Sequence, residues 1–305
     1  MTSVGETDRT GFSDADPGPK ARAGLQRREH FATALLILPV LVVTIVFFVL
    51  PLSMMMVESF KKDGAFSLAQ YHEFFTSPIY YWVILTTFTL SLITTVGTLI
   101  IGYPVAYYLA TTRSRLRNAL LLLVVIPYWL DYIVRSYSWM ILLGRNGIIS
   151  RALQDAKLTD GPVTLLYNTF SVSVGMIQIM LPLMILTLYA AMLRIDQELV
   201  LAARVHGAGV WRSFAKVFLP LSLPGIYAAA LLVFIISLGF YVTPALLGGP
   251  GQAMISQSID VIASRLLDFP LASAAAMVLL AISLLVVIVY NRTFGWDRAW
   301  TSPGI

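Results

Sequence analysis

Long uninterrupted apolar stretches divide this chain into six segments separated by short polar ones. The apolar stretches cover residues 31–57, 80–111, 117–143, 164–193, 219–247 and 269–291. Each exceeds the roughly 20 residues that a helix needs to cross a bilayer. None alternates between apolar and polar positions as the strands of a membrane barrel do. The pattern therefore predicts an all-α integral membrane protein built as a bundle of six transmembrane helices.

The segments outside these stretches complete the predicted domain organisation. Residues 1–29 are polar, rich in Gly, Pro, Asp and Arg, and without an apolar period, which indicates a flexible tail. Residues 30–292 are expected to form one membrane domain, and residues 293–305 a short C-terminal tail. The first apolar run is too long for a secretory signal peptide.

Composition agrees with a membrane class and excludes several chemistries. The chain is 58% hydrophobic and 12% charged over 305 residues, and it has no cysteine. A disulfide framework, a thiolate metal site and a cysteine nucleophile are therefore excluded. The net charge of +5 does not indicate nucleic-acid binding in a membrane chain. The positions of the basic residues relative to the spans are more informative than their sum.

Lys and Arg residues indicate how the helices are oriented. If the N-terminus is cytoplasmic, fourteen of them fall in the cytoplasmic segments and six in the external ones. The positive-inside rule then predicts that both termini are cytoplasmic. The same orientation places the long polar interruption at about 195–218 in the cytoplasm.

This interruption has an unusual order of residues. Leu199, Ala202, Ala203, Val205 and His206 fall close to one face of a short helix. Two glycines follow, and an apolar period then resumes, so two short helices joined by a glycine turn are expected. Prolines at positions 220 and 224 suit the return of the chain into the next span. From the residues alone, the loop is either a knob that a partner binds or a helix lying on the membrane surface.

The loop resembles the Glu-Ala-Ala motif of permease subunits of type I ATP-binding-cassette importers, in which Glu-Ala-Ala-x-x-x-Gly precedes a Leu-Pro pair. The matching residues are Ala202, Ala203, Gly207, Leu219 and Pro220. Leu201 replaces the glutamate of the motif, and Glu198, one helical turn earlier, is the candidate substitute for it. The resemblance implies that the loop forms coupling helices that fit a groove of the ATPase, with Ala208 also at the contact.

The chain is most similar to the spermidine/putrescine permease group. The similarity lies in the segments Pro127–Trp139, Leu142–Gly147 and Phe240–Gly249. It implies an inner-membrane permease of a bacterial cell that moves a polyamine, or alternatively another small solute such as an opine, an amino-acid derivative or an iron complex.

The resemblance also implies the assembly. Two ATPase subunits, a second permease subunit (identical or homologous) and an extracytoplasmic solute-binding protein are the expected partners. ATP and Mg²⁺ would be bound by the ATPase subunits, so no cofactor, metal or catalytic residue is expected in this chain.

Charged and aromatic residues within the third span are candidates for the substrate pathway. Asp131 and Arg135 are four residues apart, so they either pair with each other or line an aqueous path. Tyr128, Trp129 and Tyr132 surround them and either bind an amine by cation–π contact or belong to an interfacial aromatic belt. Tyr241 and Thr243, at the end of the fifth span, are expected to line the same cavity. Other polar or helix-distorting residues also lie within the spans. Gln178 is a polar residue of the fourth span, with interhelical hydrogen bonding as its alternative role. Two prolines, Pro104 and Pro182, lie inside spans.

Motifs of other functional classes are missing from the sequence. There is no phosphate-binding Gly-x-x-x-x-Gly-Lys-Ser/Thr loop and no Gly-x-Ser-x-Gly elbow. The three histidines have no metal-ligand spacing. A membrane enzyme would need a polar cluster that is not visible, and a stand-alone secondary transporter would be expected to show internal repeats. The sequence therefore favours a transport subunit over both.

Overall fold

The computed structural model describes residues 37–294 apart from positions 63, 113 and 160. It divides into two units, residues up to Met54 and residues from Met55 onward. The described part of the first unit is helical from Ile37 and includes the π-helical turn η1 (Ile45–Val49). The helix continues as α2 (Leu50–Ser59) into the second unit.

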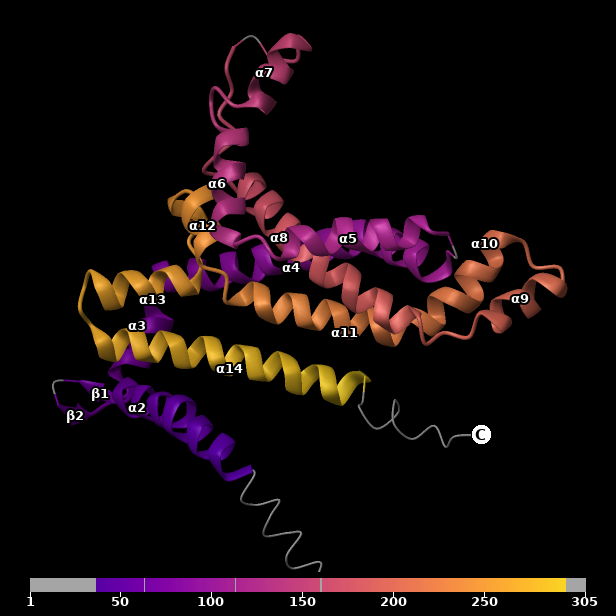
Figure 1. Ribbon diagram of the computed structural model, residues 1–305. Coiled ribbons are helices and arrows are strands. Elements are labelled where there is room, and N and C mark those ends of the chain that lie inside the picture. Colours follow the sequence, from indigo (N-terminus) through magenta and orange to yellow (C-terminus); the bar gives the residue numbers. More distant parts are fainter. Residues whose placement is uncertain (1–36, 63, 113, 160, 295–305) are drawn as a thin grey trace, which may run out of the picture. The chain divides into compact units, whose positions relative to one another are not determined.

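The second unit is helical apart from one small hairpin (Figure 1). The hairpin pairs β1 (Lys61–Lys62) with β2 (Ala65–Phe66) in antiparallel register. The helices in chain order are α3 (Ala69–Thr76), α4 (Pro78–Thr111), α5 (Leu116–Tyr128), α6 (Tyr132–Leu143), α7 (Ile148–Asp155), α8 (Thr169–Met192), α9 (Gln197–Val205), α10 (Val210–Ser213), η2 (Phe214–Phe218), α11 (Leu219–Leu238), α12 (Val242–Leu247), η3 (Pro250–Gln252), α13 (Ile255–Ser264) and α14 (Phe269–Phe294).

Helices α4, α8 and α11 pack against one another and form the core of the second unit. Its main apolar cluster takes buried side chains from all three, including Leu109, Met184 and Val233. On α4, buried threonines such as Thr87 and Thr94 bond the carbonyl four residues earlier. A buried hydroxyl is costly only when it lacks a partner, so these side chains are compatible with a tightly packed helix face.

Glycines allow this close packing. A Cβ added at Gly225 of α11 would lie 2.5 Å from the Cβ of Ala191 on α8. A Cβ at Gly97 of α4 would lie equally close to the side chain of Ile177. Small residues at helix contacts are typical of membrane bundles, because association there depends on packing rather than on the hydrophobic effect.

The described residues contain five helices long and apolar enough to cross a membrane, or six if a bent pair counts as one span. This agrees with the predicted helical membrane class. The second predicted span matches α4, and the sixth matches α14. The fourth begins later than predicted, at Thr169, because Asn168 closes a capping box with Ser171. The predicted C-terminal tail at 293–305 begins too early, because residues 293–294 still belong to α14. The rest of that tail, the predicted tail at 1–29 and the first residues of span one lie outside the described residues.

The prediction of one continuous third span over 117–143 was wrong. The chain bends by 92° between Leu116–Tyr128 and Tyr132–Asp155. Pro127 lies in the last turn of α5 and cannot donate a backbone hydrogen bond. Asp131 then caps a new helix, its side chain accepting a bond from the backbone N–H of Ile133 at 2.6 Å.

The fifth span was also misplaced. One continuous helix runs over Val210–Leu238, so the second short helix of the predicted loop is the beginning of this span. The π-helical turn η2 precedes Pro220 and keeps the helix unbroken across it. At the other end the helix stops before Gly239, and the predicted residues 242–247 form the separate α12.

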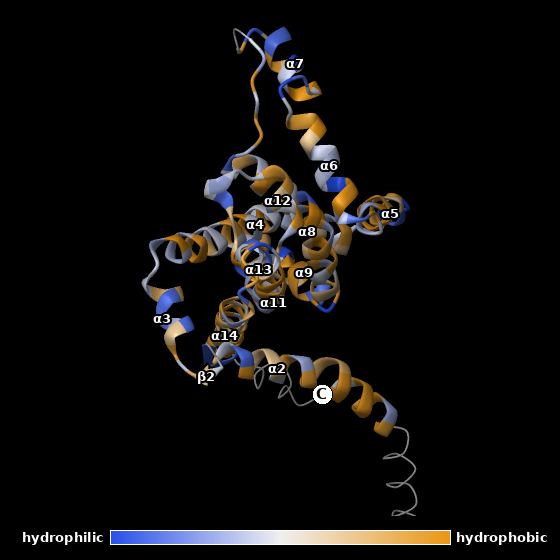
Figure 2. Ribbon diagram, turned by 90° about the vertical axis from the view of Figure 1, so that its left-hand side faces the viewer, coloured by the Kyte–Doolittle hydropathy of each residue, from blue (hydrophilic) through white to orange (hydrophobic). Residues whose placement is uncertain are grey.

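Different helices and connections lie at the two ends of the second unit (Figure 1). The connection between α8 and α11, with α9 and α10, is at the same end as the connection between α4 and α5. Helix α12 and the projecting α6–α7 arm lie at the opposite end. Hydrophobic residues dominate α8, α11 and α14, whereas the tip of the arm and α3 carry hydrophilic ones (Figure 2).

The contact at Gly225 gives a test of the packing. Replacement of Gly225 by Ala should destabilise the chain by about 1–3 kcal/mol, because overpacking against Ala191 outweighs the gain in helix propensity. The measurement is the thermal midpoint of the purified chain in mild detergent. Gly251→Ala is the control, since nothing lies within 4 Å of its added Cβ. Equal midpoints for the two variants would contradict the close packing of α8 and α11.

Candidate functional site

A cavity of about 620 Å³ lies where α5 ends and α6 begins. Its opposite wall is the junction between α11 and α12. Its lining residues are Tyr128, Trp129, Leu130, Asp131, Tyr132, Arg135, Ile179, Met180, Ile236, Gly239, Phe240, Tyr241, Val242 and Thr243. All seven residues that the sequence suggested for a substrate pathway are among them, although they come from two separate segments.

Asp131 lies at the rim of this cavity as the N-cap of α6. One carboxylate oxygen is bonded to the helix start, and the residue is exposed. The sequence left open whether Asp131 pairs with Arg135 or lines a path. The ion pairs within the described part of the chain join Lys61 to Glu58 and Lys62 to Glu73, so no such pair forms between Asp131 and Arg135. The sequence spacing assumed one continuous helix through both residues, whereas Asp131 precedes the first turn.

Arg135 has the opposite environment. Its side chain is buried, with 9% of the residue exposed, and it lines the cavity. Within the described residues, its Nε and Nη1 atoms are buried and have no hydrogen-bond acceptor. Buried donor atoms without an acceptor are costly, which makes this guanidinium a candidate for binding an acceptor group of a ligand.

The aromatic residues differ in their surroundings. Trp129 is 84% exposed, whereas Tyr128 and Tyr132 are each about half exposed at the cavity. Tyr137 and Trp139 are not among the lining residues, and Trp139 packs against the apolar cluster that contains Met176. Among the aromatic residues of the predicted third span, those that line the cavity are therefore the three at the break.

The second wall is held by hydrogen bonds between elements. The hydroxyl of Tyr241 donates to the carboxylate of Asp260 on α13 at 3.0 Å, and this bond raises the pKa of Tyr241. The phenol therefore remains protonated at neutral pH. Thr243 is buried, and its hydroxyl lies 3.0 Å from that of Ser136 on α6. Thr243 thus ties α12 to the broken span at the edge of the cavity.

Other residues at this site were not suggested by the sequence. Ile179, Met180 and Ile236 form an apolar wall, and nothing distinguishes them in the sequence from other core residues. Gln178, beside Ile179, does not line the cavity, and its buried Oε1 has no partner among the described residues. Pro104 and Pro182 lie inside uninterrupted helices.

The 195–218 loop is at the other end of the bundle (Figure 1). Asp196 caps α9 by accepting from the backbone N–H of Glu198 at 2.8 Å. Gly207 then ends the helix with φ +86°, a left-handed conformation that favours glycine. Nothing lies within 4 Å of a Cβ added at Gly207. The glycine is therefore required by backbone conformation rather than by contacts within this chain.

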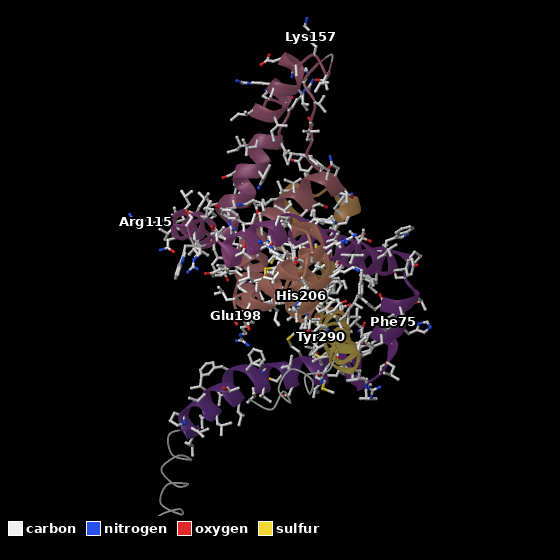
Figure 3. The ribbon with its side chains drawn as sticks, turned by 90° about the vertical axis from the view of Figure 1, so that its right-hand side faces the viewer. Phe75, Arg115, Lys157, Glu198, His206 and Tyr290 are labelled. Carbon is white, nitrogen blue, oxygen red and sulfur yellow. The ribbon has the colours of Figure 1, made fainter. Side chains whose placement is uncertain are left out.

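The loop presents most of the predicted coupling residues at its surface. Glu198, Ala202, Gly207 and Pro220 are exposed, and Glu198 is labelled in Figure 3. Ala203, Ala208 and Leu219 are half-buried. Val200, which the sequence did not single out, is the residue of α9 that is buried against the core of the same chain.

Exposed apolar side chains and a concavity complete the loop. Leu201, at the position of the motif glutamate, is 60% exposed, and Val205 and Trp211 are 80% and 77% exposed. A separate hollow of about 390 Å³ lies at the glycine turn of the loop. Its lining residues are Ala203, His206, Gly207, Ala208, Arg212, Lys216 and Val217. In the described part of the chain, no group of three or more His, Asp or Glu residues could hold a metal ion.

Known proteins share this arrangement. The family described as "Binding-protein-dependent transport system inner membrane component" matches residues 99–294. The spermidine/putrescine transport system permease protein PotB of Haemophilus influenzae is 33% identical over 258 residues, which cover 81% of this chain and 89% of that protein. The PotB of Salmonella typhimurium is 31% identical over 215 residues, 70% of this chain and 75% of that protein.

The fold is also found in a solved structure. A chain of a bacterial alginate ABC transporter in complex with an alginate pentasaccharide-bound periplasmic protein aligns with a TM-score of 0.73 and 20% identity. The alignment covers 92% of this chain and 98% of that one.

The fold is that of an all-helical membrane protein, structurally like the permeases of ATP-binding-cassette importers. The chain belongs to the family of inner membrane components of binding-protein-dependent transport systems, the permease subunits of ATP-binding-cassette importers. It is thus a multi-pass inner-membrane protein. Members of this family have no catalytic activity of their own and hold no cofactor, as the sequence predicted.

Proposed function

We propose that this permease moves a small solute, in the first place a polyamine, through the cavity at the break between α5 and α6. The observation that carries the proposal is the convergence of seven candidate residues from two segments on that one cavity. Backbone breaks at membrane depth are tolerated where they are buried in protein or line an aqueous space. Discontinuous helices also form the substrate sites of many transporters.

The polyamine assignment rests on similarity and on local chemistry. The relatives named above are spermidine/putrescine permeases at 31–33% identity. Asp131 offers a carboxylate oxygen beyond the one that caps α6, and Tyr128 and Tyr132 offer aromatic faces to an ammonium group.

A second candidate is a solute that bears an anionic group, such as an opine or another amino-acid derivative. The Nε and Nη1 atoms of Arg135, which are buried and have no acceptor among the described residues, favour it. Arginine binds carboxylates in bidentate geometry, and such a bond would compensate its buried charge. A polyamine would therefore need Asp131, whereas an anionic solute would need Arg135.

The loop supports the second half of the proposal, which is coupling to ATP hydrolysis. Two ATPase subunits would bind the 195–218 loops of this chain and of a second permease subunit, and both termini would be cytoplasmic. A solute-binding protein would deliver the solute from the other side. Binding of ATP would then bias the permease pair between two packings through the rigid connection from the loop into α11.

Charge substitutions at the cavity distinguish the two solute classes. For a polyamine, Asp131→Asn should raise the KM of uptake about tenfold, the loss of one charged hydrogen bond, while Arg135→Gln should not impair it. For an anionic solute the effects should be reversed. Asn remains a good N-cap, so α6 is retained. The measurement is uptake of labelled spermidine, and in parallel of a labelled opine, by cells expressing the whole transporter. Arg151→Gln, exposed on α7, is the control. If neither cavity variant changes uptake, the cavity is not the path.

The glycine turn of the loop tests the coupling role. Gly207→Leu should lower uptake at least tenfold while the chain remains in the membrane, because it strains the left-handed turn by about 1–2 kcal/mol and adds bulk at the contact. Gly64→Leu is a matched control: Gly64 has φ +81° and nothing within 4 Å of an added Cβ, but it lies in the hairpin. Uptake by Gly207→Leu equal to that of the control would contradict the contact.

A further inference from the structure

The hollow in the 195–218 loop is lined by basic side chains from two directions. His206 follows α9, whereas Arg212 and Lys216 come from the first turns of the helix that continues into α11. No acidic residue is among the lining residues. The turn at Gly207 brings these side chains together, because it reverses the chain between the two helices.

Acids of the same loop do not neutralise this hollow. Asp196 and Glu198 are both at the start of α9, where Asp196 caps the helix. Neither of the ion pairs between described residues, Lys61 with Glu58 and Lys62 with Glu73, involves Arg212 or Lys216. The loop therefore has an acidic end and a basic end, and the basic end is concave.

The same loop also has exposed apolar side chains outside the hollow. Val205 and Trp211 are at least three-quarters exposed, and Leu201 is 60% exposed. An exposed Trp near charged groups is typical of an anchor at a protein interface. Leu201 replaces the acidic residue of the family motif, so a basic partner group opposite this position would find no carboxylate there.

A protein surface fits this loop better than the membrane does. The helix Val210–Leu238 has 29 residues and is therefore about 43 Å long, whereas the hydrocarbon core is about 30 Å thick. A helix lying on lipid would separate one apolar face from one charged face. Here the basic groups instead surround a concavity, into which a side chain of a partner can project.

We propose that the ATPase subunit places one or more carboxylates in this hollow, between Arg212 and Lys216, and contacts Leu201, Val205 and Trp211 through apolar residues. This inference rests on the proposed coupling function and specifies its chemistry: the permease loop supplies the positive charge and the ATPase the negative charge. Electrostatic complementarity of this kind fixes the register and choice of partner.

The test uses a water-soluble carbodiimide on membranes that contain the assembled transporter. The reagent activates a carboxylate, which then forms an amide with a lysine amine in direct contact and releases the reagent as a urea. A Lys216 peptide joined to an Asp or Glu of the ATPase, found by mass spectrometry, is expected. Lys216→Gln should abolish the product, and Arg212→Gln should lower its yield several-fold.

Further variants separate charge from structure. Lys216→Arg keeps the charge but has no amine, so the cross-link should disappear while uptake is retained. The double variant Arg212→Gln/Lys216→Gln should lower ATP-driven uptake at least tenfold. Arg194→Gln, exposed and outside the hollow, should change neither.

Three outcomes would overturn the inference. If the ATPase co-purifies but Lys216 forms no link to it, the proposed function stands and the charge assignment fails. Linkage of Lys216 to lipid carboxylates alone would assign the hollow to the membrane surface. Absence of any ATPase from the purified transporter would overturn the coupling proposal together with this one.

Discussion

The structure depends on the requirement that backbone polar groups be satisfied inside a membrane. Hydrocarbon offers no hydrogen-bond partner, so a chain that crosses it remains helical unless an interruption is capped or faces water. The long helices α4, α8 and α11 follow this rule. The break between α5 and α6 departs from it, and there Asp131 caps the new helix at the rim of a cavity. The break between α5 and α6 is therefore the part of the membrane domain whose structure the requirement to cross the bilayer does not explain.

Both candidate working parts of this permease are formed where a helix is interrupted. At the cavity, the break turns α6 away by 92° and leaves charged and aromatic side chains facing the junction of α11 and α12. At the loop, the left-handed Gly207 reverses the chain and exposes apolar and basic side chains. The helix Val210–Leu238 begins at the loop and ends at the cavity. One continuous helix therefore connects the loop to the cavity wall.

The sequence predicted the class of fold well, because apolar length alone identifies a membrane helix. It also identified the residues at the cavity, since charge and aromaticity are visible without coordinates. It failed where a helix ends within an apolar run: Pro127 and Asp131 were read as internal to one span, so the capping role of Asp131 was missed. The loop was misread for a related reason, because a π-helical turn lets the helix pass Pro220. The apolar wall at Ile179 and Met180 depends on tertiary packing and has no signal in the sequence.

The central claim is that the cavity at the broken span is the transport path and that ATP changes its access. The chain has no cysteine, so a Met180→Cys variant carries a single thiol, and its labelling can be read on this subunit after the subunits are separated. In proteoliposomes with the complete transporter, the rate at which a membrane-impermeant thiol reagent modifies this position should change several-fold when ATP is added. A cysteine at Leu285, which is exposed on α14, should show no such change. An unchanged rate at Met180→Cys, in liposomes that still take up solute, would contradict the account.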